Sequence, residues 1–238
     1  MANSYFKFKQ FTVYQEHEAF GVTTDSVLLG AWAAVEGAEN ILDIGTGTGL
    51  LALMAAQRSE ARIVAIEPDR ISFMQAGLNI TASPWHGRIT LLNTSIQEYR
   101  PSGNLLFDAI ITNPPYFVDS LLNPSESKAR ARHTVNMSHA DLAGAAARLL
   151  SPAGILHLVL PVNEAERFLA LAAEGGLICV RRCSVRPTPA LPPARVLMSF
   201  QPGGPQSCDE SEMAIEKGGR HIYSDEYVSL TKDFYLKF

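Results

Sequence analysis

An apolar run that stops at an asparagine, two prolines and an aromatic residue is the segment best suited to chemistry. Residues 107–112 read Phe-Asp-Ala-Ile-Ile-Thr, which is rich in β-forming residues and too short for a helix, so they predict a buried strand. Pro114 holds Asn113 in an extended conformation, and Pro115 removes a further backbone donor, so the chain leaves the strand in a fixed loop. The Asn113 side-chain oxygen and the Pro114 carbonyl are then two acceptors beside the ring of Tyr116. Two acceptors and a flat wall suit a planar NH2 group.

A second candidate site lies upstream, in a glycine-rich turn. Residues 41–44 predict a strand that runs into Gly45-Thr46-Gly47-Thr48-Gly49 and then into a helix at 50–56, which opens a doubly wound α/β sheet. The glycines let a ligand approach the backbone, and the helix N-terminus offers free N–H groups. Because Ala52 completes the dinucleotide fingerprint, the turn alone does not distinguish NAD from S-adenosylmethionine.

Two carboxylates refine the ligand expected at this turn. Asp43 ends the strand before the glycines, where an acidic side chain suits a cofactor with an ammonium group rather than a pyrophosphate. Glu67 follows the next predicted strand, about 20 residues beyond the glycines, where a carboxylate grips a ribose diol. Glu67 fits both NAD and S-adenosylmethionine. Ser95 and Ile96 follow a third predicted strand and are expected to face the cofactor's adenine.

The elements that position these residues follow the pattern of an open α/β sheet. Ligands bind outside the carboxyl ends of the strands in such sheets, so the glycine turn, Glu67, Ser95 and Asn113 are expected to meet in one crevice. The helix after Thr23 is expected to have Thr24 or Asp25 as its N-cap. Residues 177–185 and 195–201 predict an antiparallel hairpin, because too few residues separate them for a crossover helix. Turns or loops are predicted at 151–154 and 202–219.

Length and composition set the outer bounds. The 238 residues, 47% of them hydrophobic, suit a single domain, with a strand or hairpin extension at 1–25 and a catalytic core at 26–238. There is no run of roughly 18 apolar residues, and residues 1–14 lack the apolar core of a signal peptide, so a cytoplasmic protein is expected. The three cysteines have no zinc-like spacing and imply neither a metal nor a disulfide.

Two basic segments are candidates for phosphate contact, although the net charge of −4 argues against wholesale coating by nucleic acid. The first follows the Asn-Pro-Pro loop directly and contains Lys128, Arg130, Arg132 and His133; a solvated surface loop is the alternative. The second contains Arg181, Arg182, Arg186 and Arg195; an arginine-decorated sheet edge that resists aggregation is the alternative. The segment that contains Lys7 and Lys9 is interpreted as an edge strand that covers the core; the alternative is that both lysines line a substrate groove.

Taken together, these motifs resemble a known family. The Asp-Ile-Gly-Thr-Gly-Thr-Gly turn, Glu67, the Asn-Pro-Pro-Tyr loop and the final hairpin resemble the S-adenosylmethionine-dependent amino-methyltransferases of the seven-stranded Rossmann-like class. Four further segments are similar to the bacterial tRNA1(Val) (adenine(37)-N6)-methyltransferases: residues 8–11, 24–32, 83–85 and 131–134. The resemblance to this family extends over nearly the whole chain. The resemblance implies an α/β fold whose seven-stranded sheet has an antiparallel last strand and helices on both faces. Many relatives carry Asp where Ser95 stands, and Ser95 makes a weaker contact with adenine.

The resemblance also implies an activity and a set of site residues. The activity is methyl transfer from S-adenosylmethionine to the exocyclic N6 of adenine 37 in the anticodon loop of a tRNA, without a metal, by a monomer or weak dimer. The implied catalytic residues are Asn113, Pro114 and Tyr116. The implied cofactor-binding residues are Thr24, Asp25, Asp43, Gly45, Thr46, Gly47, Gly49, Glu67, Pro68, Ser95, Ile96 and Asn113. The implied substrate-binding residues are Pro115, Tyr116, Phe117, Lys128, Arg130, Arg132, His133, Arg181, Arg182 and Arg186.

Several alternatives stay open at this point. The same reaction suits other planar NH2 groups: a glutamine amide in a protein, guanine N2 in rRNA or adenine in DNA. The glutamine enzymes that resemble this core usually carry a substantial helical domain before it, whereas the glycine turn here begins at Gly45. An NAD(P) oxidoreductase fits the fingerprint but lacks a Tyr-x-x-x-Lys or similar hydride-relay pattern. A protein that binds the cofactor and RNA without turnover is the third alternative.

Overall fold

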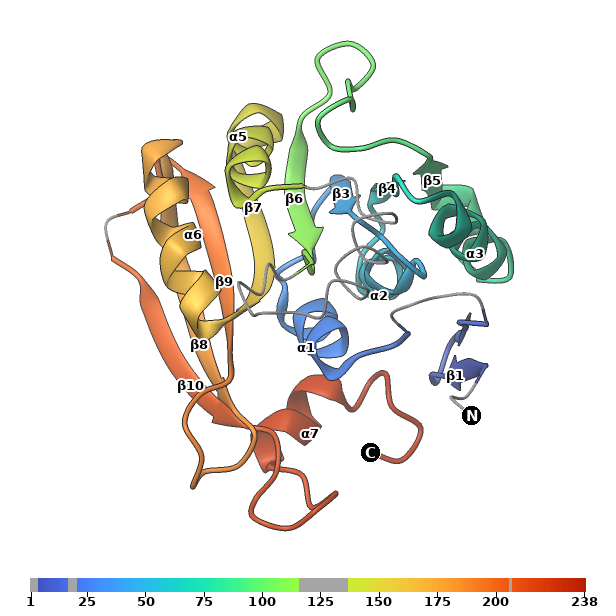
Figure 1. Ribbon diagram of the computed structural model, residues 1–238. Coiled ribbons are helices and arrows are strands. Elements are labelled where there is room, and N and C mark those ends of the chain that lie inside the picture. The colour runs from blue at the N-terminus through green and yellow to red at the C-terminus, as the bar shows by residue number, and fades with distance from the viewer. Residues whose placement is uncertain (1–3, 17–20, 116–136, 206) are drawn as a thin grey trace, which may run out of the picture.

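Among the residues that the structure describes, the sheet that carries the candidate residues contains eight strands in the order β10-β8-β9-β7-β6-β3-β4-β5 (Figure 1). The computed structural model describes residues 4–16, 21–115, 137–205 and 207–238. The strands of this sheet are β3 (Asn40–Ile44), β4 (Arg62–Ile66), β5 (Ile89–Leu92), β6 (Phe107–Thr112), β7 (Leu150–Pro161), β8 (Leu177–Arg186), β9 (Arg195–Pro202) and β10 (Asp209–Ala214). The helices are α1 (Thr24–Trp32), α2 (Leu50–Arg58), α3 (Arg70–Thr81), α5 (His139–Leu149), α6 (Val162–Glu174) and α7 (Asp225–Thr231), with a 3-10 turn at η1 (His86–Arg88).

The strands run parallel except for β9, which is antiparallel to both of its neighbours, β7 and β8. The predicted hairpin and the antiparallel strand are therefore confirmed. Because β8 again runs parallel to β7, the loop between β8 and β9 lies at the same edge of the sheet as the carboxyl ends of β3, β4 and β6. That edge is where an open α/β sheet binds its ligands.

Both faces of the sheet are buried, which explains the nearly continuous apolar runs of its central strands. On β3, Ile41 packs into one core cluster with residues of α1 and α2, whereas Leu42 packs into a second cluster with residues of α5 and α6. On β6, Ile111 belongs to the first of these clusters and Ile110 to the second. Consecutive residues of a strand point to opposite faces, so the sheet is covered by helices on both sides, as predicted.

Four helices of the described chain, α1, α3, α5 and α7, begin at a side chain that accepts a hydrogen bond from a backbone N–H of the first turn. Thr23 accepts from the backbone N–H of Ser26 at the start of α1, so the N-cap is Thr23 rather than the predicted Thr24 or Asp25. Asp69 caps α3 and accepts from the backbone N–H of Ser72. Ser138 and Asp141 form a reciprocal capping box at α5. These caps fix where each helix meets the edge of the sheet.

Two loop predictions are wrong. Residues 151–154 belong to β7, whose pairing with β6 shifts register between Phe107 and Ala109. Gly154 lies so close to β6 that a Cβ there would be 2.5 Å from the Phe107 carbonyl oxygen, so the extra residues are taken up by a bulge rather than a turn.

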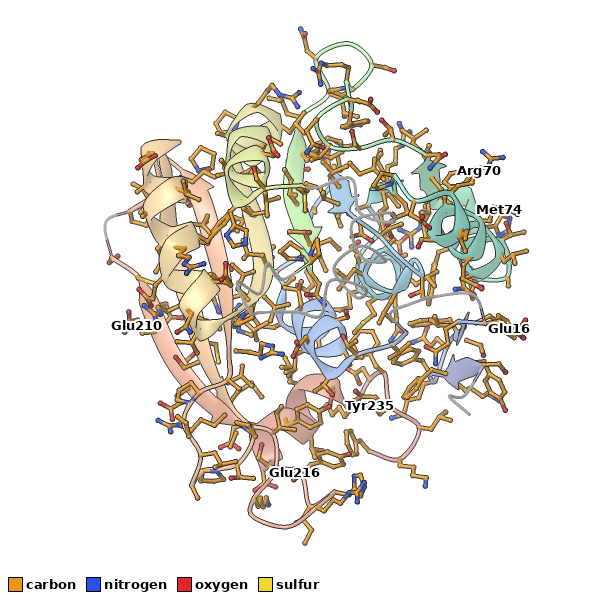
Figure 2. The ribbon with its side chains drawn as sticks, viewed as in Figure 1. Glu16, Arg70, Met74, Glu210, Glu216 and Tyr235 are labelled. Carbon is orange, nitrogen blue, oxygen red and sulfur yellow. The ribbon has the colours of Figure 1, made fainter. Side chains whose placement is uncertain are left out.

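The second wrong prediction is the loop at 202–219, because residues 209–214 form the edge strand β10 and extend the expected seven strands to eight. Its first four residues, Asp-Glu-Ser-Glu, are exposed and carry no apolar alternation. Glu210 lies opposite Arg182 of β8 in the parallel register and pairs with it at 3.9 Å. Figure 2 shows Glu210 at the outer edge of the sheet. The strand is held by its backbone ladder and by charge pairs, which no hydrophobic pattern reveals.

A separate hairpin, β1 (Tyr5–Lys7) with β2 (Thr12–Tyr14), precedes the sheet as predicted. Its Lys9 donates hydrogen bonds to the carbonyl oxygens of Lys232 (2.5 Å) and Phe238 (3.0 Å) at the end of the chain. Phe8 stacks on the ring of Tyr235, which Figure 2 labels in the C-terminal segment. The hairpin thus covers the core and ties down the C-terminus, in agreement with the edge-strand interpretation.

One histidine and two cysteines contact other side chains of the protein. His157 is a core residue of β7, where its ring forms a hydrogen bond with Ser199 Oγ at 2.8 Å and burial lowers its pKa to about 3. The thiols of Cys179 and Cys208 lie 3.7 Å apart on the β8–β10 edge.

No helix in the described part of the chain is long and apolar enough to cross a membrane. Among those residues, no group of three His, Cys, Asp or Glu side chains is placed to hold a metal ion.

Candidate active site

The carboxyl ends of β3, β4 and β6 are tied together by hydrogen bonds at one edge of the sheet. The backbone N–H groups of Gly45 and Thr46 both donate to the carbonyl oxygen of Ile66, each at 3.0 Å. On the other side of β3, the Thr112 hydroxyl donates to the carbonyl oxygen of Ile44 at 2.9 Å. The glycine turn, Glu67 and Asn113 each follow one of these strand ends, so the structure brings them to neighbouring positions.

The glycine turn leaves open space where side chains would otherwise stand. Gly45 and Gly47 have φ values of 68° and 56°, in the left-handed region that favours glycine. A Cβ at either position would meet no heavy atom within 4 Å. The turn ends at Gly49, which begins α2 with a φ of 85°. This open cradle beside a helix N-terminus suits a ligand that approaches the backbone closely.

Asp43 is fully buried beneath the turn, and among the described residues one of its two oxygens has no hydrogen-bond partner. Its Oδ2 accepts hydrogen bonds from the Thr46 hydroxyl at 2.5 Å and from the backbone N–H of Ala52 at 3.0 Å, so it fastens the turn to α2. Its Oδ1 has no hydrogen-bond partner within the described ranges. Burial raises the pKa of this carboxyl from 3.8 to about 7, against the hydrogen bond from Thr46. A cation near this site would favour the ionised form.

Glu67 links the end of β4 to the glycine turn. Its Oε2 accepts from the backbone N–H of Gly47, and its Oε1 accepts from the backbone N–H of Asp69, both at 2.9 Å. The side-chain amide of Asn93 holds the same loop from the next strand end, because it donates to the carbonyl oxygens of Glu67 (2.8 Å) and Pro68 (3.1 Å). Sequence reasoning missed Asn93. Its place directly after a strand was the available signal.

Ser95 and Ile96 are buried after β5, with only 4% and 3% of their surfaces exposed. The Ser95 hydroxyl accepts from the backbone N–H of Glu98 at 3.3 Å, and the Ser95 carbonyl oxygen accepts from the N–H of Tyr99 at 2.9 Å. Ser95 therefore closes a local turn. A contact of these two residues with adenine stays a prediction.

Asn113 is half-buried at the end of β6, followed by the buried Pro114 and the exposed Pro115. Its amide Nδ2 donates to the Ser26 hydroxyl oxygen on α1 at 2.9 Å. Sequence reasoning missed Ser26, since no local pattern connects two residues 87 positions apart. The predicted site residues Tyr116, Phe117, Lys128, Arg130, Arg132 and His133 lie outside the described residues.

The start of α1 brings Thr24 and Asp25 to the same region as Ser26. The Asp25 carboxylate accepts from the Arg195 guanidinium at 2.7 Å, which joins α1 to the first residue of β9. This ion pair is partly buried, with side-chain exposures of 33% for Arg195 and 19% for Asp25. Contact of Thr24 or Asp25 with a cofactor stays a prediction.

The arginines of the β8 segment all have partners within the protein. Arg181 lies over the ring of Trp32, with its guanidinium carbon 4.1 Å from the ring centroid. Arg182 pairs with Glu166 and Glu210, and Arg186 pairs with Glu212. The alternative of an arginine-decorated sheet edge is wrong, because β10 covers β8 and β8 is the second strand of the sheet. Binding of RNA phosphates by the three arginines stays a prediction.

Comparisons with known proteins agree with this geometry. Residues 22–170 match the methyltransferase small domain. The tRNA1(Val) (adenine(37)-N6)-methyltransferase of Phocaeicola vulgatus is 47% identical over 236 residues, which cover 99% of each chain. The protein of the same name from Parabacteroides distasonis is 45% identical over 237 residues, which cover 100% of each chain.

Solved structures show the same fold at lower identity. A predicted O-methyltransferase from Agrobacterium tumefaciens superposes with a TM-score of 0.68 at 18% identity and covers 88% of this chain and 96% of that one. A T. thermophilus 16S rRNA N2 G1207 methyltransferase, in complex with AdoMet and guanosine, superposes with a TM-score of 0.57 at 22% identity and covers 84% of this chain and 50% of that one. With the full-length relatives and the matched domain, these findings show that the chain belongs to the family of tRNA1(Val) (adenine(37)-N6)-methyltransferases.

Proposed function

We propose that this protein transfers a methyl group from S-adenosylmethionine to N6 of adenine 37 in the anticodon loop of tRNA1(Val). The observation that carries the proposal is the position of Asn113. Asn113 follows β6, which pairs with the strand that leads into the glycine turn. Its side-chain amide is held by Ser26, and its backbone is followed by two prolines. The names of full-length relatives support tRNA and position 37 as the target.

The residues around the glycine turn fit S-adenosylmethionine. The open cradle at Gly45 and Gly47 leaves room for the methionine part, and the unpartnered Oδ1 of buried Asp43 gains from a nearby ammonium group. Glu67 has lone pairs beyond those used for Gly47 and Asp69, so it can also accept from ribose hydroxyls. When bound, this cofactor supplies an electrophilic methyl group on a sulfonium centre. The other proposed cofactor-binding residues are Thr24, Asp25, Thr46, Gly49, Pro68, Ser95, Ile96 and Asn113.

The acceptors after β6 are suited to an amine that is a poor nucleophile. The lone pair of an exocyclic adenine nitrogen is delocalised into the ring. Hydrogen bonds from its two N–H groups to the Asn113 oxygen and the Pro114 carbonyl favour a pyramidal nitrogen with its lone pair available for attack. Such catalysis depends on positioning and electrostatics rather than on a strong base.

The base must leave its stack to reach these acceptors. Stacking on Tyr116, with Phe117 nearby, holds an extruded base and contributes roughly 1–3 kcal/mol. A base in an anticodon loop is already partly exposed, which lowers the cost of extrusion. Lys128, Arg130, Arg132 and His133 follow the Asn-Pro-Pro-Tyr loop in sequence and are the proposed phosphate contacts. The proposal describes a single-domain enzyme that acts as a monomer or weak dimer in the cytoplasm.

The test is transfer of labelled methyl from S-adenosylmethionine to bulk tRNA from cells that lack this protein, followed by nucleoside analysis. Label in N6-methyladenosine at position 37 of tRNA1(Val) is the expected result. Asn113→Ala serves as the control for adventitious transfer. Label that appears only in guanine N2, in DNA adenine or in protein glutamine would overturn the adenine assignment. Absence of transfer to all of these, with S-adenosylmethionine still bound, would indicate a binding protein without turnover.

A further inference from the structure

A chain of three side-chain hydrogen-bonding groups runs from the start of α1 to Asn113. The Thr23 hydroxyl accepts from the backbone N–H of Ser26 at 3.2 Å and lies 3.1 Å from the Ser26 hydroxyl. The Ser26 hydroxyl oxygen in turn accepts from Asn113 Nδ2 at 2.9 Å. When Ser26 donates its own hydrogen to Thr23, the lone pairs of Ser26 are directed to the Asn113 amide. The N-cap of α1 therefore reaches the candidate active site through Ser26.

An asparagine amide has two chemically opposite ends. Half a turn about its terminal bond exchanges the acceptor oxygen and the donor NH2 group at almost no steric cost. Only one of these arrangements can accept a hydrogen bond from a substrate amine, because the other presents two further N–H donors to it. The protein must therefore hold the nitrogen end of Asn113 away from the substrate.

We propose that Ser26 is a positioning residue for methyl transfer, because its hydroxyl holds the amide nitrogen of Asn113 and so turns the amide oxygen towards the substrate amine. This inference rests on the proposed function. Ser26 does not itself contact the reacting atoms. It acts through Asn113, so its effect belongs to the rate of the chemical step rather than to the binding of cofactor or RNA.

The sequence supplies a matched control for this hydroxyl. Ser26 is the third residue of α1, and its backbone N–H is bonded to the N-cap Thr23; Ser72 is the third residue of α3, and its backbone N–H is bonded to the N-cap Asp69. In both helices the capping bond uses the serine backbone. Substitution by alanine keeps either cap, and only Ser26→Ala removes a bond to Asn113.

The experiment measures kcat, KM for tRNA and Kd for S-adenosylmethionine in the full-length enzyme with Ser26→Ala, Ser26→Thr and Ser72→Ala. We expect Ser26→Ala to lower kcat about tenfold and to leave KM and Kd within about twofold, since misplacement of a contacting group costs up to about a hundredfold. Ser26→Thr keeps a hydroxyl and should restore most of the rate. Ser72→Ala should match the wild type. Thermal melts in the presence of S-adenosylmethionine report whether each variant is folded.

A double-mutant cycle separates positioning from a merely structural role. In the Asn113→Ala background, measured as single turnovers at high enzyme concentration, Ser26→Ala should have no further effect, because its partner is already gone. The inference is overturned if Ser26→Ala keeps the wild-type kcat, if it lowers the rate of Asn113→Ala by the same factor, or if its whole effect is on the Kd for S-adenosylmethionine. If the wild-type enzyme methylated another planar amine instead of adenine, only the proposed function would be overturned. The role of Ser26 could still be tested, because the double-mutant cycle can be measured with that amine as the substrate. An enzyme that methylates none of these acceptors would overturn both.

Discussion

The Glu67 carboxylate holds the glycine turn in place, because its Oε2 accepts a hydrogen bond from the backbone N–H of Gly47 at 2.9 Å. Its second oxygen accepts from the N–H of Asp69 at the same distance. A buried side chain at the end of β4 thus organises both the turn after β3 and the start of α3. The same carboxylate is the proposed ribose ligand, so cofactor binding and local order depend on one residue.

Glu67→Gln is expected to weaken S-adenosylmethionine binding at least tenfold and to lower the Tm. A glutamine has one acceptor oxygen, so its NH2 group must face one of the two backbone N–H groups, and an unsatisfied buried N–H costs roughly 1–3 kcal/mol. For a chain of this size, each kcal/mol lowers Tm by about 2–4 °C. Titration calorimetry and thermal unfolding measure the two effects.

Glu60→Gln is the matched control, because the Glu60 side chain is 96% exposed and its nearest cationic group, on Arg88, is 3.8 Å away. This variant loses the same charge and should change neither quantity. If Glu67→Gln lowered Tm but bound S-adenosylmethionine as well as the wild type, Glu67 would be a structural residue only.

The Asp43 carboxyl is expected to make S-adenosylmethionine binding depend on pH. Burial raises its pKa to about 7, so the group is neutral at pH 6 and increasingly charged towards pH 7.5. The ammonium group of the cofactor is attracted to the charged form, so Kd should fall over this range. Asp43→Asn should bind more weakly and without this dependence. A variant with the same pH profile as the wild type would exclude Asp43 as the titrating group.

The same pKa predicts a sign for stability. Because the pKa in the folded state lies above the ordinary value of 3.8, the folded protein holds the proton more tightly than the unfolded chain between these two values. The free energy of unfolding should therefore decrease as pH rises from about 4 to about 7. Asp43→Asn should lack this part of the decrease, which denaturant titrations at several pH values can measure.

Much of the fold was predictable because its central strands are buried on both faces. The apolar run at residues 41–44 is followed by a glycine, and the run Phe107–Thr112 is followed by an asparagine and two prolines. The type of these strands, their order and the ligand-binding edge therefore follow from local patterns. The family prediction is confirmed by the full-length relatives and by the matched domain. The acidic strand β10 has no such pattern and depends on partners in β8.

The sequence predicts individual residues of the site but not the side chains that hold them in place. Asp43 was identified near the end of a strand, and Glu67 and Asn113 directly after strands; the structure brings all three to one edge of the sheet. Their partners were not, because the bond between Ser26 and Asn113 and the pairing of Arg182 with Glu210 join side chains far apart in the chain. Such contacts are set by topology and cannot be read from spacing.

Asn113→Ala is expected to keep S-adenosylmethionine binding and to lose methyl transfer by about 100-fold or more. Removal of one preorganised hydrogen-bond partner of a reacting group costs about this factor in other enzymes. Asn113→Asp keeps an acceptor and should retain more activity than Asn113→Ala. The exposed Asn104 supplies an asparagine-to-alanine control that should behave as the wild type. Full transfer by Asn113→Ala would exclude the acceptor role.

Tyr116→Ala should lose far more activity than Tyr116→Phe if the ring holds the extruded base by stacking. The loss of stacking corresponds to roughly 1–3 kcal/mol, whereas phenylalanine keeps the aromatic face. The kcat/KM for tRNA measures the difference. Tyr5→Ala, at a half-exposed position on the hairpin, should match the wild type. Equal losses in the two Tyr116 variants would assign the role to the hydroxyl group instead.

The salt dependence of tRNA binding should distinguish the two basic segments. Arg130 and Arg132 follow the Asn-Pro-Pro-Tyr loop, whereas Arg182 and Arg186 are already paired with glutamates. Each phosphate contact adds about 0.7–0.9 to the magnitude of the slope of log K against log salt concentration. Arg130→Gln with Arg132→Gln should therefore weaken binding and reduce this slope by about 1.5.

Arg182→Gln with Arg186→Gln removes the same charge and should leave the slope unchanged, since these guanidinium groups would have to abandon Glu210 and Glu212 to reach a phosphate. The opposite result, with the slope reduced only by the β8 variants, would move the tRNA to the β8–β10 edge. An unchanged slope in both pairs would assign the phosphate contacts to other residues and return the segment after Tyr116 to a solvated surface loop.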